Sequence, residues 1–269
     1  MTVNKTSEPL FPKEKEDTIR ENYGDWQTNY EFAKNVCLYL KNRGIVPDIV
    51  VEPTCGVGNF IAAAIDVFET IKKVYGVEIF KGYVDQTEKK LQEYQKNNLI
   101  VSYELYNADV FNFDFREIAN QNPDQNILVI GNPPWVTNSG LGKNDGVNLP
   151  VKGNINKTKG IEAITGKGNF DIAESICNQI IDDFSHHGNT HIALLVKNSV
   201  VKNIIHRQHF HPRRIQDVRQ LVFDAKKEFN VSVPASLFEC HIGNDCQKEC
   251  ISYDFYTKRI THSFGWVNE

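Results

Sequence analysis

Apolar and polar residues alternate along the chain in blocks that predict strands and helices in turn. Short apolar runs, typical of buried strands, are DIVVEPT, VYGVEI, SYELYNADV, ILVIG and HIALLVKNS. Between them lie segments with helical periodicity. In TNYEFAKNVCLYLKNRG, for example, Phe32, Val36 and Leu40 share one face and Gly44 ends the pattern. Strands that alternate with helices predict an α/β fold with a doubly wound, Rossmann-like, mostly parallel sheet.

The carboxyl-terminal third departs from this alternation. RQLVFDAK and VSVPASLFECHIG follow one another as two strand patterns without a long helix between them, which predicts an antiparallel hairpin. In residues 244–269 the run CISYDFYTKRI is a candidate for one more strand. We expect residues 1–19, polar and proline-containing, to form a loose arm.

Length and composition exclude several classes of protein. A chain of 269 residues is long enough for one large α/β domain. No apolar run approaches the roughly 20 residues of a membrane helix, and the polar start is not a secretory signal. Six cysteines without such a signal indicate reduced thiols, so we expect a cytoplasmic protein.

Three of the cysteines raise the possibility of a zinc site. Cys240, His241, Cys246 and Cys250 are potential ligands near the carboxyl terminus. However, no C-x-x-C pair is present, and Cys240 ends an alternating, strand-like run. We therefore interpret these cysteines as core and surface thiols and expect no metal.

The net charge of −4 argues against general attraction to nucleic acid, but two stretches are locally basic. Residues 202–214 hold four Lys/Arg and no acid, and residues 137–168 hold five lysines in a Gly/Asn-rich segment that we expect to be a mobile loop. Both follow the strand ILVIG along the chain. They are candidates for phosphate binding, or else simply solvated surface.

The ends of the predicted strands carry the candidate chemistry, at Glu52, Glu78, Asp109 and Asn132. ILVIG runs directly into Asn-Pro-Pro-Trp. Proline cannot donate a backbone hydrogen bond and restricts φ, so the chain leaves the sheet here in a stiff turn. Binding sites of open α/β sheets lie at the carboxyl ends of their strands. The turn is therefore suited to hold a flat group.

The first strand ends in a glycine loop, VVEPTCGVGNF, with Gly56 and Gly58. A dinucleotide fingerprint would need a third glycine where the chain has Ile61, so a nicotinamide or flavin site is disfavoured. Glu78, about twenty residues farther on, can accept hydrogen bonds from ribose hydroxyls, and Asp109 is placed for an adenine edge. Each feature alone could be a tight turn or a helix cap. Together they favour a nucleoside without pyrophosphate.

With these motifs the sequence resembles the adenine-N6 DNA methyltransferases. NPPW matches their catalytic motif, [N/D/S]-P-P-[Y/F/W], and EPTCGVGNF matches their S-adenosylmethionine loop. GDWQTN lies where the family closes over the cofactor, and EFNVSVPASLF resembles a later motif whose aromatic residue, here Phe229, packs on a flipped base. The resemblance spans residues 20–243. It implies a seven-stranded methyltransferase sheet and the γ motif order, and is closest to type II restriction-modification systems.

The resemblance also implies a set of site residues. The catalytic residues would be Asn132, Pro133, Pro134 and Trp135, and the residues on the flipped base would be Trp135 and Phe229. The cofactor residues would be Trp26, Gln27, Thr28, Glu52, Pro53, Thr54, Cys55, Gly56, Gly58, Phe60, Glu78, Ile79, Asp109, Val110 and Asn132.

The Asn-Pro-Pro-Trp turn is also compatible with substrates other than adenine in DNA. It occurs in enzymes that methylate a glutamine of release factors or guanine N2 of RNA, and an amino-cytosine is a further target. A C5-cytosine enzyme is disfavoured because it needs a nucleophilic cysteine in this loop. A non-catalytic subunit with this fold, binding a partner or nucleic acid, is an alternative of another class, although it would not need Asn132.

The expected partner is double-stranded DNA. In the γ arrangement a recognition domain follows the catalytic one and needs roughly 100 residues, whereas residues 244–269 form only a short extension. We therefore expect either a fragment of a longer enzyme or a separate specificity subunit. The alternative is a small enzyme that reads a short site through the basic loop.

Overall fold

A computed structural model describes residues 27–135 and 171–265 of the chain. The predicted amino-terminal arm, Trp26 and the predicted basic loop at 137–168 lie outside the described residues. None of the helices in the described ranges is long and apolar enough to cross a membrane.

The described strands form one sheet in the order β3-β2-β1-β4-β5-β7-β6-β8-β9. The first five strands are parallel, β7 runs antiparallel between β5 and β6, β8 is parallel to β6, and β9 is antiparallel to β8. The bounds are β1 Ile49–Glu52, β2 Lys73–Glu78, β3 Ser102–Asn107, β4 Ile127–Gly131, β5 Thr190–Lys197, β6 Ile215–Phe223, β7 Ala235–Ile242, β8 Glu249–Asp254 and β9 Ile260–Gly265.

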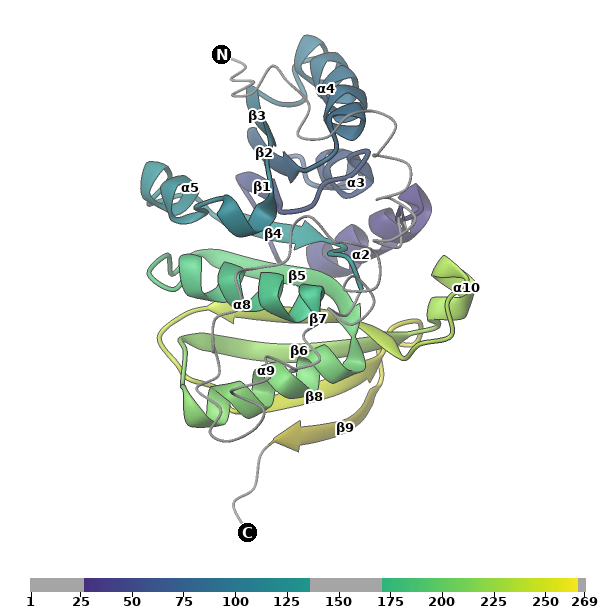
Figure 1. Cartoon of the computed structure of the whole chain (residues 1–269), viewed down its shortest axis with the longest axis vertical. Coiled ribbons are helices and arrows are strands. Elements are labelled where there is room, and N and C mark those ends of the chain that lie inside the picture. Colours follow the sequence, from purple (N-terminus) through teal and green to yellow (C-terminus); the bar gives the residue numbers. More distant parts are fainter. Residues whose placement is uncertain (1–26, 136–170, 266–269) are drawn as a thin grey trace, which may run out of the picture.

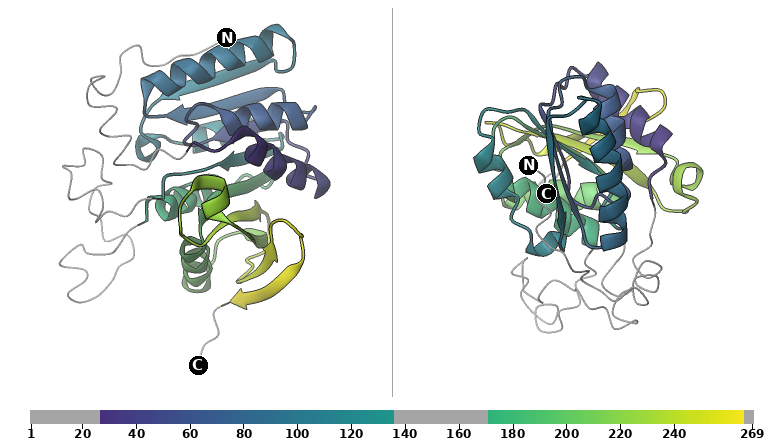
Figure 2. Two further views of the ribbon diagram at one scale, coloured as in Figure 1. Left: turned by 90° about the vertical axis from the view of Figure 1, so that its right-hand side faces the viewer. Right: turned by 90° about the horizontal axis from the view of Figure 1, so that it is seen from above.

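Helices cover both faces of this sheet. α2, α3 and α4 lie on one face, and α5, α8 and α9 on the other (Figures 1 and 2). The helices are α2 Tyr30–Asn42, α3 Asn59–Val67, α4 Lys81–Lys96, α5 Arg116–Gln121, α8 Ile172–Asp183, α9 Asn198–Phe210 and α10 Ala225–Phe229, with a 3₁₀ turn, η1, at Val110–Asn112. Because they are covered on both faces, β1 and β4 are buried along their whole length, as their continuous apolar sequences require.

The predicted doubly wound α/β fold with its antiparallel β6–β7 hairpin is confirmed. The sheet differs from the expected seven strands because β8 and β9 lengthen it to nine strands in the described part of the chain. α3 ends at Val67, where Phe68 turns to extended backbone with its ring in the core. α9 was not predicted as a helix, although Val200, Val201, Ile204 and Ile205 are buried at helical spacing.

The basic stretch 202–214 lies mainly on α9, which leads from the carboxyl end of β5 back to the start of β6. Because β5 and β6 point the same way, the end of this stretch is at the opposite edge of the sheet from the predicted site. Arg207 and Arg213 both pair with Asp182, at 3.7 and 3.6 Å, and Arg213 also donates to Asn178. Arg214 donates to the Asn244 side chain at 3.1 Å, so three of the four cations have partners within the fold.

The cysteine-rich segment is divided between strands. Cys240 in β7 and Cys250 in β8 are buried, and Cys246 is exposed between them. The ring of His241 stacks on His191, with centroids 4.4 Å apart. In residues 27–135 and 171–265, no group of three or more His, Cys, Asp or Glu side chains is arranged to hold a metal ion.

A buried carboxyl on β7 connects the sheet to α2. The Glu239 side chain is 1% exposed and accepts a hydrogen bond from the Tyr39 hydroxyl at 2.8 Å. The Arg43 guanidinium lies 3.4 Å from its other oxygen and also pairs with Asp217. Burial raises the pKa of Glu239 to about 7, although Arg43 and Tyr39 act in the opposite direction.

We predict that Glu239→Gln removes one component of the pH dependence of stability. A raised pKa means that the folded protein holds the proton more tightly. This contribution is therefore full below pH 4.5, the ordinary value, and is lost as the pH rises through about 7. Between pH 4.5 and about 7, the free energy of unfolding of the variant should therefore rise by about 3 kcal/mol relative to that of the wild type.

Urea unfolding at several pH values measures this difference. The neighbouring His191, whose pKa is lowered by burial to about 4, titrates in both proteins and cancels in the comparison. A constant difference between the two proteins from pH 4 to 8 would contradict the prediction.

Candidate cofactor and catalytic site

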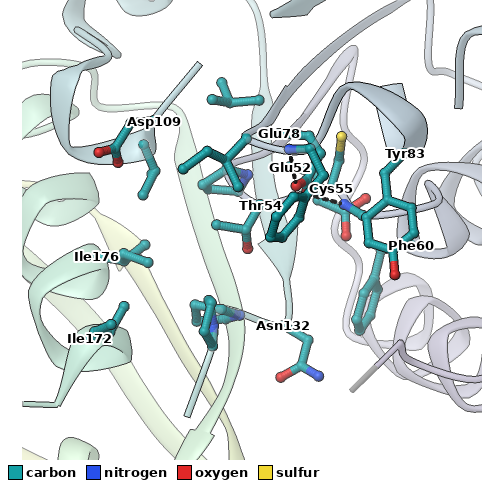
Figure 3. Close-up of a pocket in the computed structure, with 18 of the residues that line it drawn as sticks. Glu52, Thr54, Cys55, Phe60, Glu78, Tyr83, Asp109, Asn132, Ile172 and Ile176 are labelled. Atoms are coloured by element: carbon teal, nitrogen blue, oxygen red, sulfur yellow. Dashed lines mark hydrogen bonds between the residues drawn. The ribbon is translucent and has the colours of Figure 1, made fainter. Parts of the chain in front are cut away.

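The carboxyl ends of the parallel strands open on one cavity, shown in Figure 3. Asp109 and Ile176 lie on one side of it, the glycine loop with Glu52 and Glu78 lies on the other, and Asn132 is at the rim. The lining residues are Gln27, Thr28, Glu52, Pro53, Thr54, Cys55, Gly56, Asn59, Phe60, Val77, Glu78, Ile79, Phe80, Tyr83, Ala108, Asp109, Val110, Phe111, Asn132, Pro133, Pro134, Trp135, Ile172 and Ile176. Most of the residues named from the sequence are thus brought together.

The glycine loop joins β1 to α3 and is held from the side by α4. Gly58 has φ +75°, and a Cβ on it would lie 2.8 Å from the Thr87 methyl. The Thr87 hydroxyl donates to the Gly56 carbonyl at 2.9 Å. Lys90 donates to the Val57 carbonyl at 2.6 Å, and burial lowers the pKa of Lys90. Gly58 does not itself line the cavity, so its part is to let the loop pass close to α4.

Glu78, at the end of β2, faces the cavity and also organises the backbone around it. One carboxylate oxygen accepts the Gly56 N–H at 2.8 Å and the other accepts the Phe80 N–H at 2.9 Å. The Asn107 amide donates to the Glu78 and Ile79 carbonyls, at 3.0 and 2.8 Å, and so holds the strand end. The backbone around the cavity thus holds this carboxylate in a fixed orientation.

Glu52, at the end of β1, is buried beneath the loop. It accepts the Ile61 N–H at 3.3 Å, in the first turn of α3. Burial, and then the neighbouring charge of Glu78, raise the pKa of Glu52 well above its ordinary value. The two acids of the site therefore differ in environment: Glu78 is bound by backbone donors on both oxygens, and Glu52 is in a largely apolar setting.

Asp109 follows β3 and caps the η1 turn by accepting the Phe111 N–H at 3.0 Å. Burial raises the pKa of this half-buried carboxyl. The capping role considered from the sequence is thus present, and the residue also lines the cavity. Val110 and Phe111 form an apolar wall beside it.

The segment before α2 reaches over the glycine loop. The Gln27 side chain accepts the Val57 N–H at 3.2 Å, and the Thr28 carbonyl accepts the Asn59 amide at 2.8 Å. Both residues line the cavity, and a role of this segment in closing over a cofactor stays a prediction.

The Asn-Pro-Pro-Trp turn forms the rim at the end of β4. Trp135 is 9% exposed, and its indole N–H donates to the Leu195 carbonyl at 3.0 Å. Phe229 is 6% exposed and packs edge-on against Trp135, with ring centroids 5.4 Å apart. Phe229 is not among the lining residues, but it packs on Trp135, which is. Its stacking on a substrate base stays a prediction.

Several lining residues were not identified from the sequence. Phe80 and Tyr83 pack on one another near the glycine loop, and Ile172 and Ile176 enter from α8. The two isoleucines are on the buried face of α8, which is far in the sequence from the strand ends at Glu52 and Glu78. Only the packing of α8 against β5 and η1 brings them to the cavity.

We predict that Gly58→Ala costs more stability than Gly44→Ala. Both glycines have left-handed backbone, with φ +75° and +85°, which costs an alanine about 1–2 kcal/mol. Around Gly44 a new Cβ meets open space, whereas at Gly58 it meets Thr87 at 2.8 Å. Denaturant unfolding of the two variants measures the difference. Equal losses would mean that the contact with Thr87 does not require glycine.

Comparisons with known proteins place this geometry in context. No protein-family model matches the chain. The chain is 41% identical over 218 residues to the type II methyltransferase M.NspV of Nostoc sp. (strain ATCC 29411 / PCC 7524). The match covers 81% of this chain and 44% of that protein, so the chain spans less than half the length of this curated relative.

Solved structures share the fold at low sequence identity. The M protein of the type I restriction enzyme EcoKI has a TM-score of 0.56 at 14% identity, over 85% of this chain and 48% of that one. A putative class I S-adenosylmethionine-dependent methyltransferase from Listeria monocytogenes has a TM-score of 0.50 at 12% identity, over 84% of this chain and 63% of that one. The chain therefore resembles a type II methyltransferase in sequence, and its fold is that of the class I S-adenosylmethionine-dependent methyltransferases.

Proposed function

We propose that the chain binds S-adenosylmethionine and transfers its methyl group to the N6 amine of adenine in DNA, as part of a restriction-modification system. The observation that carries the proposal is one cavity that joins the glycine loop and Glu78 to the Asn132 turn. The similarity to a type II methyltransferase supports the reaction class.

The cavity suits the proposed cofactor. Glu78 lines it with a carboxylate, a group that can accept hydrogen bonds from ribose hydroxyls. Ile79, Phe80, Val110 and Phe111 offer apolar walls for an aromatic ring. Asp109 lines the same cavity and would accept from an exocyclic amine of that ring. When bound, S-adenosylmethionine would supply an electrophilic methyl group on a sulfonium.

The turn at Asn132 would prepare the amine. The lone pair of an exocyclic amine is delocalised into its ring, which makes the nitrogen a poor nucleophile. The Asn132 side-chain oxygen and the Pro133 carbonyl can each accept one N–H and so favour a pyramidal nitrogen. This is stabilisation of developing charge by dipoles that are already in place. Because N6 is inaccessible within a duplex, the base would be flipped into the cavity.

We further propose that sequence reading is supplied from outside the described residues, by another part of the protein or a separate specificity subunit. The matched relative is a longer protein than this chain, and only 44% of it is covered. The described residues outside the site are occupied by the sheet and its covering helices.

Parallel assays of substrate class test the proposed function. Tritium transfer from labelled S-adenosylmethionine to duplex DNA, RNA and a release factor, followed by nucleoside analysis, should give N6-methyladenine from DNA. Label in glutamine, guanine N2 or amino-cytosine would instead establish one of the other substrates of this turn.

We predict that Glu78→Ala weakens S-adenosylmethionine binding by more than about tenfold, because the ligand hydroxyls lose their acceptor. Glu78→Gln keeps one acceptor oxygen and should bind with intermediate affinity. Because Glu78 also binds two backbone N–H groups, thermal unfolding of each variant is needed as a control. Calorimetry that finds unchanged affinity in a folded alanine variant would remove Glu78 from the cofactor site.

We predict that Asn132→Ala lowers methyl transfer by about 10²–10³-fold, as for other lost dipole contacts to a developing charge, with S-adenosylmethionine affinity nearly unchanged. Asn132→Asp retains an acceptor oxygen and should keep more of the rate. Single-turnover kinetics with saturating cofactor measure both variants. Transfer at the native rate in the alanine variant would refute the proposed role of Asn132.

A further inference from the structure

The hydrogen-bond ladder between β4 and β5 reaches a proline at the rim of the cavity. The Ile127 N–H donates to the Asn189 carbonyl at 3.0 Å, and the pairing continues from Ile127 opposite Thr190 to Gly131 opposite Leu194. In a parallel ladder the residues that face a given neighbour recur every second position. The next donor toward β5 after Gly131 would therefore be residue 133, opposite the Leu195 carbonyl. Residue 133 is proline, which has no N–H.

β5 continues beyond this point, paired on its other side with β7. Leu195 lies opposite Leu237 and Lys197 opposite Ala235, and Leu195 is fully buried. A buried backbone carbonyl that loses its donor costs free energy unless another group replaces it. The Trp135 indole N–H, 3.0 Å from the Leu195 oxygen, is that group.

We propose that Trp135 is a positioning residue whose indole N–H takes the place of the ladder bond that Pro133 cannot make. The turn is then fastened to β5 on both sides of its acceptors: by the backbone ladder as far as Gly131, and by the Trp135 side chain three residues after Asn132. This holds the Asn132 side chain and the Pro133 carbonyl at fixed places on the rim. The inference rests on the proposed role of these two acceptors in methyl transfer.

An aromatic cluster keeps the indole in this orientation. Trp135 contacts Phe229 and Phe223, with centroids 5.4 and 6.4 Å away. Phe32 of α2 packs in turn on both phenylalanines, at 5.8 and 5.1 Å. With its ring confined by these neighbours, the indole presents its N–H edge to β5. Phe229 thus supports the site through Trp135.

The test separates the N–H group from the ring. Trp135→Phe removes the donor together with part of the ring, whereas incorporation of 3-benzothienylalanine at position 135 replaces only the N–H by sulfur and keeps the shape. Both should lower the single-turnover rate of methyl transfer by about 3- to 10-fold, the usual effect of one lost hydrogen bond, with S-adenosylmethionine affinity within about twofold of the wild type.

Phe184→Leu is the control for a loss of stability alone. Phe184 is fully buried after α8 and packs on Phe115, with centroids 6.4 Å apart, outside the cluster around Trp135. This variant should lower the unfolding temperature and leave the rate unchanged. An equal fall in rate in Phe184→Leu, or a native rate with 3-benzothienylalanine, would overturn the proposal.

A second measurement does not depend on activity. The sequence has three tryptophans, so ¹⁵N-labelled protein gives three indole signals, and Trp135→Phe identifies the one of residue 135. Its N–H should exchange slowly with solvent. Fast exchange would overturn the proposed hydrogen bond. If the wild type methylates none of the substrates, the proposed function fails, and slow or fast exchange still decides whether the bond exists.

Discussion

The parallel alignment of β1, β2, β3, β4 and β5 is the constraint on which the rest of the structure depends. Parallel strands end at the same edge of a sheet, so the loops after β1, β2, β3 and β4 meet there although they are far apart in sequence. The glycine loop, Glu78, Asp109 and the Asn132 turn come together for this reason alone. The helices on both faces make the alignment possible, since they bury the strands that carry these loops.

The acids at this edge serve the fold and the cavity together. Glu78 binds the N–H groups of Gly56 and Phe80 with its two oxygens, so the residue that faces the cavity also shapes the loop around it. Asp109 likewise caps η1 and lines the cavity. A functional interpretation and a structural interpretation of the same acid are therefore not alternatives here. The same backbone contacts that orient each carboxylate make it available at the strand end.

The rim of the cavity combines stiffness with a break in the sheet. Two prolines take the chain out of β4, and Pro133 leaves the Leu195 carbonyl of β5 without a ladder donor. The Trp135 side chain, three residues after Asn132, donates to that carbonyl instead. The arrangement holds a polar turn at the edge of an apolar core. Such a site needs few charged groups, which agrees with a chemistry that depends on placed hydrogen-bond acceptors.

The sequence by itself determined the order of the strands up to β5, the helices α2, α3, α4 and α8 but not α5, the antiparallel hairpin and most of the cavity lining. These features are local: apolar runs, helical periodicity, and glycine, acid or proline at a strand end. It did not determine α9, in which basic residues are interspersed with buried isoleucines, or the lining positions Ile172, Ile176 and Tyr83.

The tertiary structure decided which groups became partners across long separations. The sequence marked Trp135 and Phe229 as aromatic, but only the sheet register brings the indole N–H to Leu195 and places Phe229 behind Trp135. Glu239 likewise pairs with Arg43 and with Tyr39, and Tyr39 lies 200 residues earlier in the sequence. Local pattern specifies elements because hydrophobic periodicity is a property of neighbouring residues. Contacts between elements depend on how the whole sheet is assembled, which no short stretch of sequence contains.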